Sequence, residues 1–216
     1  MPPSSKVFMT EICKNLDLLK YEKPHSIFNR FDVRDYLKIY SVCSEEVCNN
    51  IKLKLDNADW QSHYYYDPAK DKEIVLDHDY SIFSLPESDP DASFIMKNLW
   101  FALRSYYDAL QYDEWFSTWT GYTHVRFNRC SENNKIMRHY DGVQTLSDGL
   151  VRREPILSIV GKINNDYQGG EFVMWEDTVI NLEPGQIMIF PSNFMYPHQV
   201  NTVTRGNRYS FVSWAF

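Results

Sequence analysis

The spacing of apolar and polar residues divides the chain into two parts of different character. Before about residue 120, the clearest apolar patterns recur at helical spacing. After Gly121, short runs in which apolar and polar residues alternate follow one another, and this alternation is typical of strands with one buried face. The pattern therefore predicts an N-terminal region with helices and a C-terminal half built from strands.

Two helices and one strand are predicted in the N-terminal region. Ser44 is a suitable N-cap for a helix over residues 44–57, because its hydroxyl can accept a hydrogen bond from a backbone N–H of the first turn. An Asp-Pro pair marks the start of a second helix, over residues 90–111, since proline is tolerated at the first helical position. Residues 36–42 alternate in the manner of a half-buried strand.

Short strands are predicted throughout the C-terminal half. They cover residues 124–128, 156–163, 171–175, 178–182, 186–190 and 208–214. Pro184 and Gly185 occupy the centre of a predicted type II turn. Short strands with such turns are typical of a sandwich or barrel. No convincing linker separates the two parts, so we expect one α+β, mainly β domain over residues 1–216, in which residues 1–120 support a core of residues 121–216.

Composition and charge narrow the function classes. A chain of 216 residues suits one domain with a substantial core. A net charge of −7 and the lack of a concentrated Lys/Arg run argue against a protein that binds nucleic acid by broad phosphate neutralisation. No apolar stretch approaches the roughly 20 residues of a membrane span, and the N-terminus lacks the apolar core of a signal peptide. We therefore expect a cytoplasmic protein with no membrane partner; the sequence leaves the oligomeric state open.

The cysteines agree with that compartment. Cys13, Cys43, Cys48 and Cys130 have no zinc-like spacing with histidines. Free thiols in a reducing compartment are the simplest account, although one disulfide among them also fits the sequence.

His139, Asp141 and His198 form a candidate metal site. Residues two apart on an extended strand point to the same face, so His139 and Asp141 would reach one ion if the chain is extended there. His198 would come from another strand that pairs nearby. Two imidazoles and one carboxylate are the ligands of the facial triad, which holds Fe(II) and leaves other coordination positions open. A bare His-x-Asp is a weak signal, and only the complete arrangement of these residues indicates a metal site.

Arg208 extends this arrangement ten residues beyond His198. A guanidinium can bind a carboxylate through two parallel hydrogen bonds, which favours a co-substrate such as 2-oxoglutarate. Ser210 lies on the same strand face and could donate its hydroxyl to the same carboxylate. Filling a barrel interior explains Ser210 equally well.

Several ordered motifs accompany these residues between about residues 120 and 216. They are Arg126-Phe127-Asn128, His139-Tyr140-Asp141, Gly169-Gly170-Glu171-Phe172, Glu183-Pro184-Gly185, Phe190-Pro191-Ser192, His198, Gly206-Asn207-Arg208-Tyr209-Ser210 and Trp214. In these motifs and their spacing the C-terminal half resembles the Fe(II)/2-oxoglutarate-dependent oxygenase superfamily, and within it the prolyl 4-hydroxylase-like group. The earlier half resembles the family only loosely.

The resemblance implies a fold, a cofactor set and a reaction. The fold would be a double-stranded β-helix, or jelly roll, with supporting helices. His139, Asp141 and His198 would bind Fe(II), and Arg208, with Ser210, would bind 2-oxoglutarate. The enzyme would use O2, with ascorbate as a further cofactor of such enzymes. It would hydroxylate an aliphatic C–H bond of a prolyl or other amino-acid residue, or of a free amino acid, and release succinate and CO2.

This chain departs from the family pattern at two positions. Prolyl hydroxylases proper usually carry lysine where Arg208 stands, and a tyrosine is common where Cys130 stands. A thiol is a weak hydrogen-bond donor, so another group must assist there. A small buried side chain is the preferred interpretation of Cys130, and a reactive thiol is the alternative.

Two other functions remain open on the sequence alone. One is an oxygenase with the same cofactors that acts on a modified nucleic-acid base, which the acidic balance disfavours. The other is a non-catalytic jelly roll that binds a metal or a small ligand, which the complete triad and arginine disfavour. Residues 142–154 are interpreted as a loop beside the site, either a substrate-covering lid or ordinary disorder.

Overall fold

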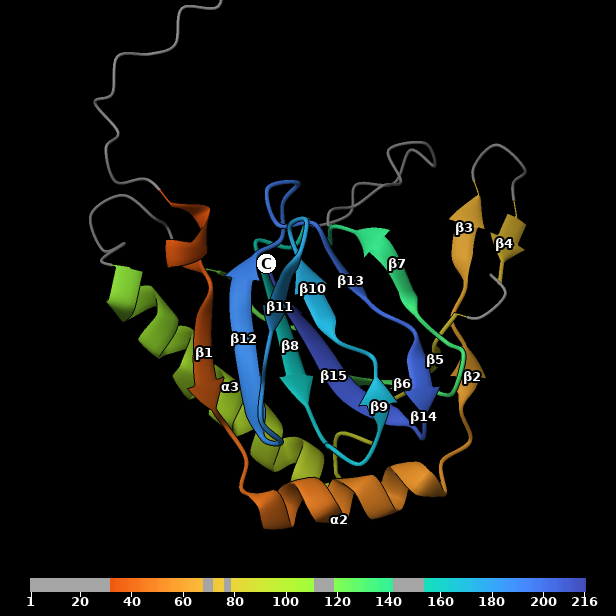
Figure 1. The fold of residues 1–216 in the computed structure, drawn as a ribbon. Coiled ribbons are helices and arrows are strands. Elements are labelled where there is room, and N and C mark those ends of the chain that lie inside the picture. The colour runs from red at the N-terminus through yellow and green to blue at the C-terminus, as the bar shows by residue number, and fades with distance from the viewer. Residues whose placement is uncertain (1–31, 68–71, 76–78, 111–118, 142–153) are drawn as a thin grey trace, which may run out of the picture. The chain divides into compact units, whose positions relative to one another are not determined.

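The computed structural model describes residues 32–67, 72–75, 79–110, 119–141 and 154–216 (Figure 1). Residues Val33–Phe216 form one compact unit. That residues 1–32 belong to the same domain stays a prediction. The loop interpreted as a lid, and Cys13, lie outside the described residues, apart from Glu154 at the end of that loop.

The first part of this unit contains both helices and short strands, and strands make up the second. The helical elements are the 3-10 helix η1 (Val33–Tyr36), α2 (Glu45–Asp56) and α3 (Pro90–Leu110). The strands are β1 (Lys38–Ser41), β2 (Gln61–Ser62), β3 (Tyr65–Asp67), β4 (Lys72–Ile74), β5 (Ser81–Phe83), β6 (Arg126–Cys130), β7 (Ile136–His139), β8 (Leu157–Lys162), β9 (Gln168–Gly169), β10 (Phe172–Met174), β11 (Thr178–Ile180), β12 (Gln186–Pro191), β13 (His198–Val200), β14 (Val203–Arg205) and β15 (Arg208–Ala215).

Two antiparallel sheets carry the architecture. The larger has seven strands in the order β1-β12-β8-β15-β6-β5-β2, and the smaller has four in the order β11-β10-β13-β7. In Figure 1 the four-stranded sheet lies on one side of the large sheet, and α2 and α3 lie on the other. Such a pair of sheets is the jelly roll that the sequence predicted, and β14-β9 and β3-β4 form two small additional ladders.

The helices begin where the sequence places their caps. The Ser44 hydroxyl accepts a hydrogen bond of 3.3 Å from the backbone N–H of Val47. The Asp89 carboxylate accepts hydrogen bonds from the first turn of α3, at Asp91 and Ala92, with lengths of 3.0 and 3.1 Å. These bonds satisfy backbone N–H groups that have no partner within the helix. Both helix predictions are confirmed to within a residue at each end.

Each face of the large sheet is buried against a different layer. On the helix side, Phe127, Ile159 and Phe211 pack with Ile95 and Leu99 of α3 in one apolar cluster. On the opposite side, strand residues pack against the four-stranded sheet in a second cluster. This second cluster includes Val160, Met188, Phe190, Val212, Phe172, Met174 and Val200. Successive residues of a strand therefore enter different cores, and polar side chains on the second face point into the jelly-roll interior.

The N-terminal region is more strand-rich than the sequence predicted. Besides its helices it supplies β1, β5 and β2 to the large sheet. β2 and β5 have only two and three residues, too few for alternation to be recognised in the sequence. The strand predicted over residues 36–42 is shorter, because Tyr36 lies in η1, where its carbonyl accepts a 2.7 Å hydrogen bond from the Tyr106 hydroxyl.

Within the described residues, no helix combines the length and the apolar character needed to cross a membrane.

The close packing of β8 against β15 generates a stability prediction. Gly161 lies opposite Phe211, and a Cβ atom added to Gly161 would overlap the Phe211 ring. We expect Gly161→Ala to lower the free energy of unfolding by about 1–3 kcal/mol, the usual cost of overpacking a core. Urea unfolding would measure it. The control is Gly121→Ala, because an added Cβ there meets nothing within 4 Å. Adding Phe211→Leu should recover part of the loss, and an unchanged or larger loss would contradict the explanation.

Candidate metal centre

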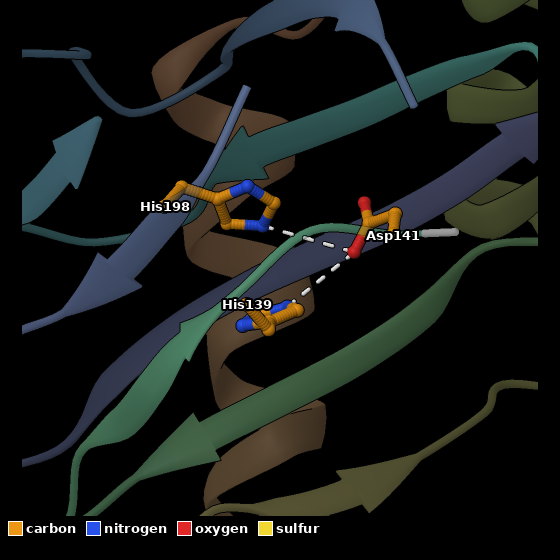
Figure 2. Close-up of side chains that lie close together, drawn as sticks. All are labelled: His139, Asp141 and His198. Atoms are coloured by element: carbon orange, nitrogen blue, oxygen red, sulfur yellow. Dashed lines mark ion pairs between the residues drawn. The ribbon is translucent and has the colours of Figure 1, made fainter. Parts of the chain in front are cut away.

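The structure brings His139, Asp141 and His198 together at one point of the jelly roll. His139 ends β7 and His198 begins β13, and the two residues are direct partners in the antiparallel ladder. Asp141 follows two residues after His139, just beyond β7. One ligand atom from each of the three residues lies within 4.8 Å of the other two (Figure 2). The prediction that His198 comes from a pairing strand is therefore confirmed.

The nearest polar atoms of the three side chains face one another. The Asp141 Oδ1 atom lies 3.4 Å from His139 Nε2 and 3.7 Å from His198 Nε2 (Figure 2). Two ligands at right angles around an ion, with bonds of about 2.1 Å, lie about 3 Å apart. The three atoms thus need only small movements to share one cation, and their chemistry suits a first-row transition metal.

Backbone carbonyls hold both imidazoles in orientation. His139 Nδ1 lies 2.7 Å from the Met137 carbonyl oxygen, and His198 Nδ1 lies 3.0 Å from that of Tyr196. When Nδ1–H donates to a carbonyl, the lone pair of the neutral ring is on Nε2, the atom that faces Asp141. The Phe172 ring stacks on His198, with centroids 5.2 Å apart.

Two donors hold the Asp141 carboxylate from the other side. The Ser158 hydroxyl donates to Oδ2 over 2.6 Å, and the Trp214 indole N–H donates to the same oxygen over 3.1 Å. The other oxygen of the carboxylate, Oδ1, therefore faces the imidazoles. Trp214 is one of the motif residues of the sequence but had no predicted role in the site, and no pattern distinguishes Ser158. Both positions face the interior as direct partners on β15 and β8.

At Asp141 and His198, the electrostatics favour the forms that bind a cation. Burial alone would raise the pKa of Asp141, but the hydrogen bond from His139 and the nearby imidazoles outweigh it and hold that pKa well below its usual range. Burial lowers the pKa of His198, and the charge of Asp141 opposes this only in part. At His139, burial also lowers the pKa, but the hydrogen bond and charge of Asp141 raise it overall. A metal ion would take the place of the proton that Asp141 attracts to His139.

A cavity of about 250 Å³ adjoins this cluster, and Arg208 lines it. Phe172, the residue stacked on His198, is part of the cavity wall. The Arg208 Nη1 group donates a 2.9 Å hydrogen bond to the Ser210 hydroxyl oxygen, as their shared strand face predicts. The buried Arg208 Nε–H has no hydrogen-bond partner among the described residues. A buried guanidinium with a free N–H is suited to an anion.

Lys162 and Tyr167 also line this cavity, and the sequence analysis did not select either. Burial and the charge of Arg208 lower the pKa of Lys162. Burial raises the pKa of Tyr167, and the charge of Arg208 and a hydrogen bond between these two side chains offset this rise only in part. Lys162 falls on the interior side of a predicted strand, an unusual position for a lysine and a signal that could have revealed it. Tyr167 lies outside every predicted strand, and its sequence carries no such signal.

Cys130 is fully buried opposite Arg208 on β6. Burial raises the pKa of its thiol to about 11, only partly offset by the charge of Arg208. The thiol is therefore protonated at neutral pH, which supports the interpretation of a small buried side chain rather than a reactive cysteine.

Comparisons with known proteins agree with the fold and the site. Residues 125–216 match the family model of the 2OG-Fe(II) oxygenase superfamily. A PKHD-type hydroxylase of Shewanella oneidensis is 34% identical over 93 residues, which cover 41% of this chain and 40% of the relative. A PKHD-type hydroxylase of Psychrobacter is 36% identical over 87 residues, or 38% of this chain and 30% of the relative. The matched regions thus span less than half the length of these relatives.

Solved structures share the fold at low sequence identity. A viral collagen prolyl hydroxylase from Paramecium Bursaria Chlorella virus-1, in complex with 2OG, gives a TM-score of 0.61 at 14% identity over 83% of this chain and 94% of that one. A Trichoplax adhaerens prolyl hydroxylase, in complex with a hypoxia inducible factor peptide fragment, gives a TM-score of 0.60 at 15% identity. The match covers 100% of this chain and 94% of that one.

Residues 125–216 are therefore similar in sequence to the 2OG-Fe(II) oxygenase superfamily. The fold of the chain is similar to that of the solved prolyl hydroxylases.

The two donors to Asp141 generate a prediction about metal affinity. Trp214→Phe and Ser158→Ala each remove one hydrogen bond to Oδ2. We expect each to weaken binding of Fe(II), or of Co(II) as a spectroscopic substitute, by about tenfold or more, because partners that orient a ligand contribute on this scale. Anaerobic metal titration would measure it. Trp175→Phe is the control, since the Trp175 indole donates to the Met195 carbonyl instead. Equal losses in all three variants would contradict a specific role for the Asp141 contacts.

Proposed function

We propose that this protein is an Fe(II)- and 2-oxoglutarate-dependent dioxygenase that hydroxylates an aliphatic C–H bond and releases succinate and CO2. One observation carries the proposal: Phe172 packs on His198 of the histidine–carboxylate cluster and also lines the cavity that Arg208 lines, whose Nε–H has no hydrogen-bond partner among the described residues. A metal ion and a carboxylate co-substrate would therefore bind side by side.

In this proposal, His139, Asp141 and His198 hold the iron, and Ser158 and Trp214 fix the carboxylate of Asp141. When bound, the iron and 2-oxoglutarate supply the oxygen activation and the oxidation of the C–H bond. The two carbonyl contacts keep Nε2 of each imidazole directed at the ion. The packing of Phe172 and Phe190 on His198 excludes water from that side.

Arg208 binds the distal carboxylate of 2-oxoglutarate, with Ser210 as a further donor. Ser210 accepts from Arg208 and still has its own O–H to donate. Lys162 and Tyr167 line the same cavity, so they supply the additional donors that Cys130 lacks. A second positive charge beside Arg208 is unfavourable until an anion binds, which agrees with the lowered pKa of Lys162.

The substrate we propose is a prolyl or other amino-acid residue, in a peptide, a protein or free in solution. The Trichoplax relative bound to a peptide fragment, the viral collagen prolyl hydroxylase and the PKHD-type hydroxylases support this class. The chain's net charge of −7 weighs against the alternative of a nucleic-acid base. Cys43, Cys48 and Cys130 are free thiols, and this supports the cytoplasm as its compartment.

The decisive test of this function is cofactor binding without oxygen. Adding Fe(II) and 2-oxoglutarate to the apo-protein should produce the visible charge-transfer band of the chelated complex. His139→Ala should abolish the band, because it removes one of three iron ligands. His124→Ala, which alters a histidine outside the cluster, should retain it. A folded parent protein without the band would instead favour the non-catalytic jelly roll.

Arg208 should affect the co-substrate far more than the metal. We expect Arg208→Ala to raise the 2-oxoglutarate concentration needed for half of the band by about ten- to a hundredfold, the range for a lost charged hydrogen bond. The Fe(II) affinity should change much less, because Arg208 is not one of the three clustered ligands. Exposed Arg205, on β14, provides the control Arg205→Ala. Equal loss of iron and 2-oxoglutarate binding in Arg208→Ala would contradict the assignment.

A further inference from the structure

A second arginine, Arg126, lies on the interior face of β6. Phe127 of this strand packs in the helix-side core, whereas Cys130 packs in the interior core. Arg126 is four residues before Cys130 on the strand, so the two side chains face the same side of the sheet. Its partner across the ladder is Val212, which also belongs to the interior core. In the proposed function, this arginine binds neither the iron nor 2-oxoglutarate.

Arg126 lies one side chain away from the metal cluster. Its guanidinium carbon is 5.0 Å from the ring centroid of Trp214, and the Trp214 indole donates to Asp141. This cation–π contact holds the guanidinium over the indole face. Among the described residues, the buried Arg126 Nε–H has no hydrogen-bond partner and Arg126 forms no ion pair. A buried donor left without a partner is unfavourable, so a ligand that pairs with it would gain free energy.

Arg126 and Arg208 serve different ligands. On β6, Arg126 is four residues from Cys130, the direct partner of Arg208. Four residues of a strand span about 13 Å, more than one carboxylate group can bridge. Arg208 lines the cavity assigned to 2-oxoglutarate, whereas Arg126 lies at the end of the interior where Trp214 and Ser158 contact Asp141. The position of Arg126 is therefore suited to the molecule that is oxidised.

We propose that the substrate carries a carboxylate group, which Arg126 binds beside the metal centre. This inference rests on the proposed oxygenase function and specifies its substrate class. The carboxylate is either the α-carboxylate of a free amino acid or the side chain of an acidic residue next to the oxidised residue in a peptide. A guanidinium has a planar edge that matches the two oxygens of a carboxylate.

A phosphate of a nucleic acid fits this environment less well. Binding along a phosphate backbone requires several cations, and the chain has an excess of acidic residues, with 29 Asp and Glu against 22 Lys and Arg. Arg126 presents a single guanidinium, on an aromatic ring, close to one carboxylate ligand of the metal centre.

The experiment compares matched substrates that differ by one charge. Free L-proline is paired with L-prolinamide, and a blocked proline peptide with a flanking glutamate is paired with its glutamine counterpart. Succinate formation by the Fe(II)-loaded protein is measured for each. We expect the charged member of at least one pair to have the lower KM. The pair that shows the difference identifies the source of the carboxylate.

Variants of two arginines on the same strand then locate the preference. Arg126→Gln should raise KM for the charged member by about ten- to a hundredfold, while KM for the neutral member stays within about twofold. Arg126→Lys should retain part of the preference, because it keeps the charge without the planar edge. Arg129→Gln is the matched control, since Arg129 lies over Trp60 at 4.8 Å on the helix-side face. It should leave the preference intact.

Each other outcome has a defined meaning. Equal KM values within both pairs, or equal losses for both members in Arg126→Gln, would overturn the inference.

If no compound is turned over, the same pairs are added to the anaerobic Fe(II)/2-oxoglutarate complex and the change in its charge-transfer band is titrated. If the charged member then binds no more tightly than the neutral one, or if its advantage does not depend on Arg126, the inference is rejected. The band itself would still support the proposed oxygenase function. An Arg126-dependent response to a phosphoserine peptide or a dinucleotide alone would also overturn it. Loss of the band itself in the parent would reject the proposed function.

Discussion

The antiparallel register between β7 and β13 is the constraint on which the rest of the site depends. It places His139 directly opposite His198, although 59 residues separate them in the chain. A slip of one residue would turn one imidazole to the other face of the sheet. The short β13 cannot secure this register alone, because it has three residues. Its second neighbour, β10, contributes Met174 opposite His198 and so fixes the strand from both sides.

The two-faced large sheet turns this local register into a usable site. One face is apolar and packs on α2 and α3, which makes the sheet a rigid base. The other face combines apolar residues with a few polar ones, such as Ser158, Lys162 and Arg208, at positions set by strand alternation. The helices thus stabilise a surface from which separate strands present the proposed metal, co-substrate and substrate contacts at fixed spacing.

Local patterns were enough to predict the helices, the longer strands of the C-terminal half and the type II turn, in which Gln186 N–H bonds to the Glu183 carbonyl over 2.9 Å. The clustering of His139, Asp141 and His198 followed from residue type and order. β7 was missed because it has only four residues, and buried and exposed side chains do not alternate clearly along it. The roles of Trp214 and Tyr167 depend on contacts between distant strands. Such contacts leave no trace in the sequence near either residue.

The shared position of Phe172 links the two halves of the site thermodynamically. Its ring packs on His198 and also forms part of the wall of the Arg208 cavity. Any adjustment of this ring that accompanies filling of the cavity changes the packing of a metal ligand, and the reverse holds equally. Such linkage is reciprocal, so occupancy of one compartment alters the affinity of the other by the same factor. In the proposed function, a single phenylalanine would thereby couple the affinity for the metal to the affinity for the co-substrate.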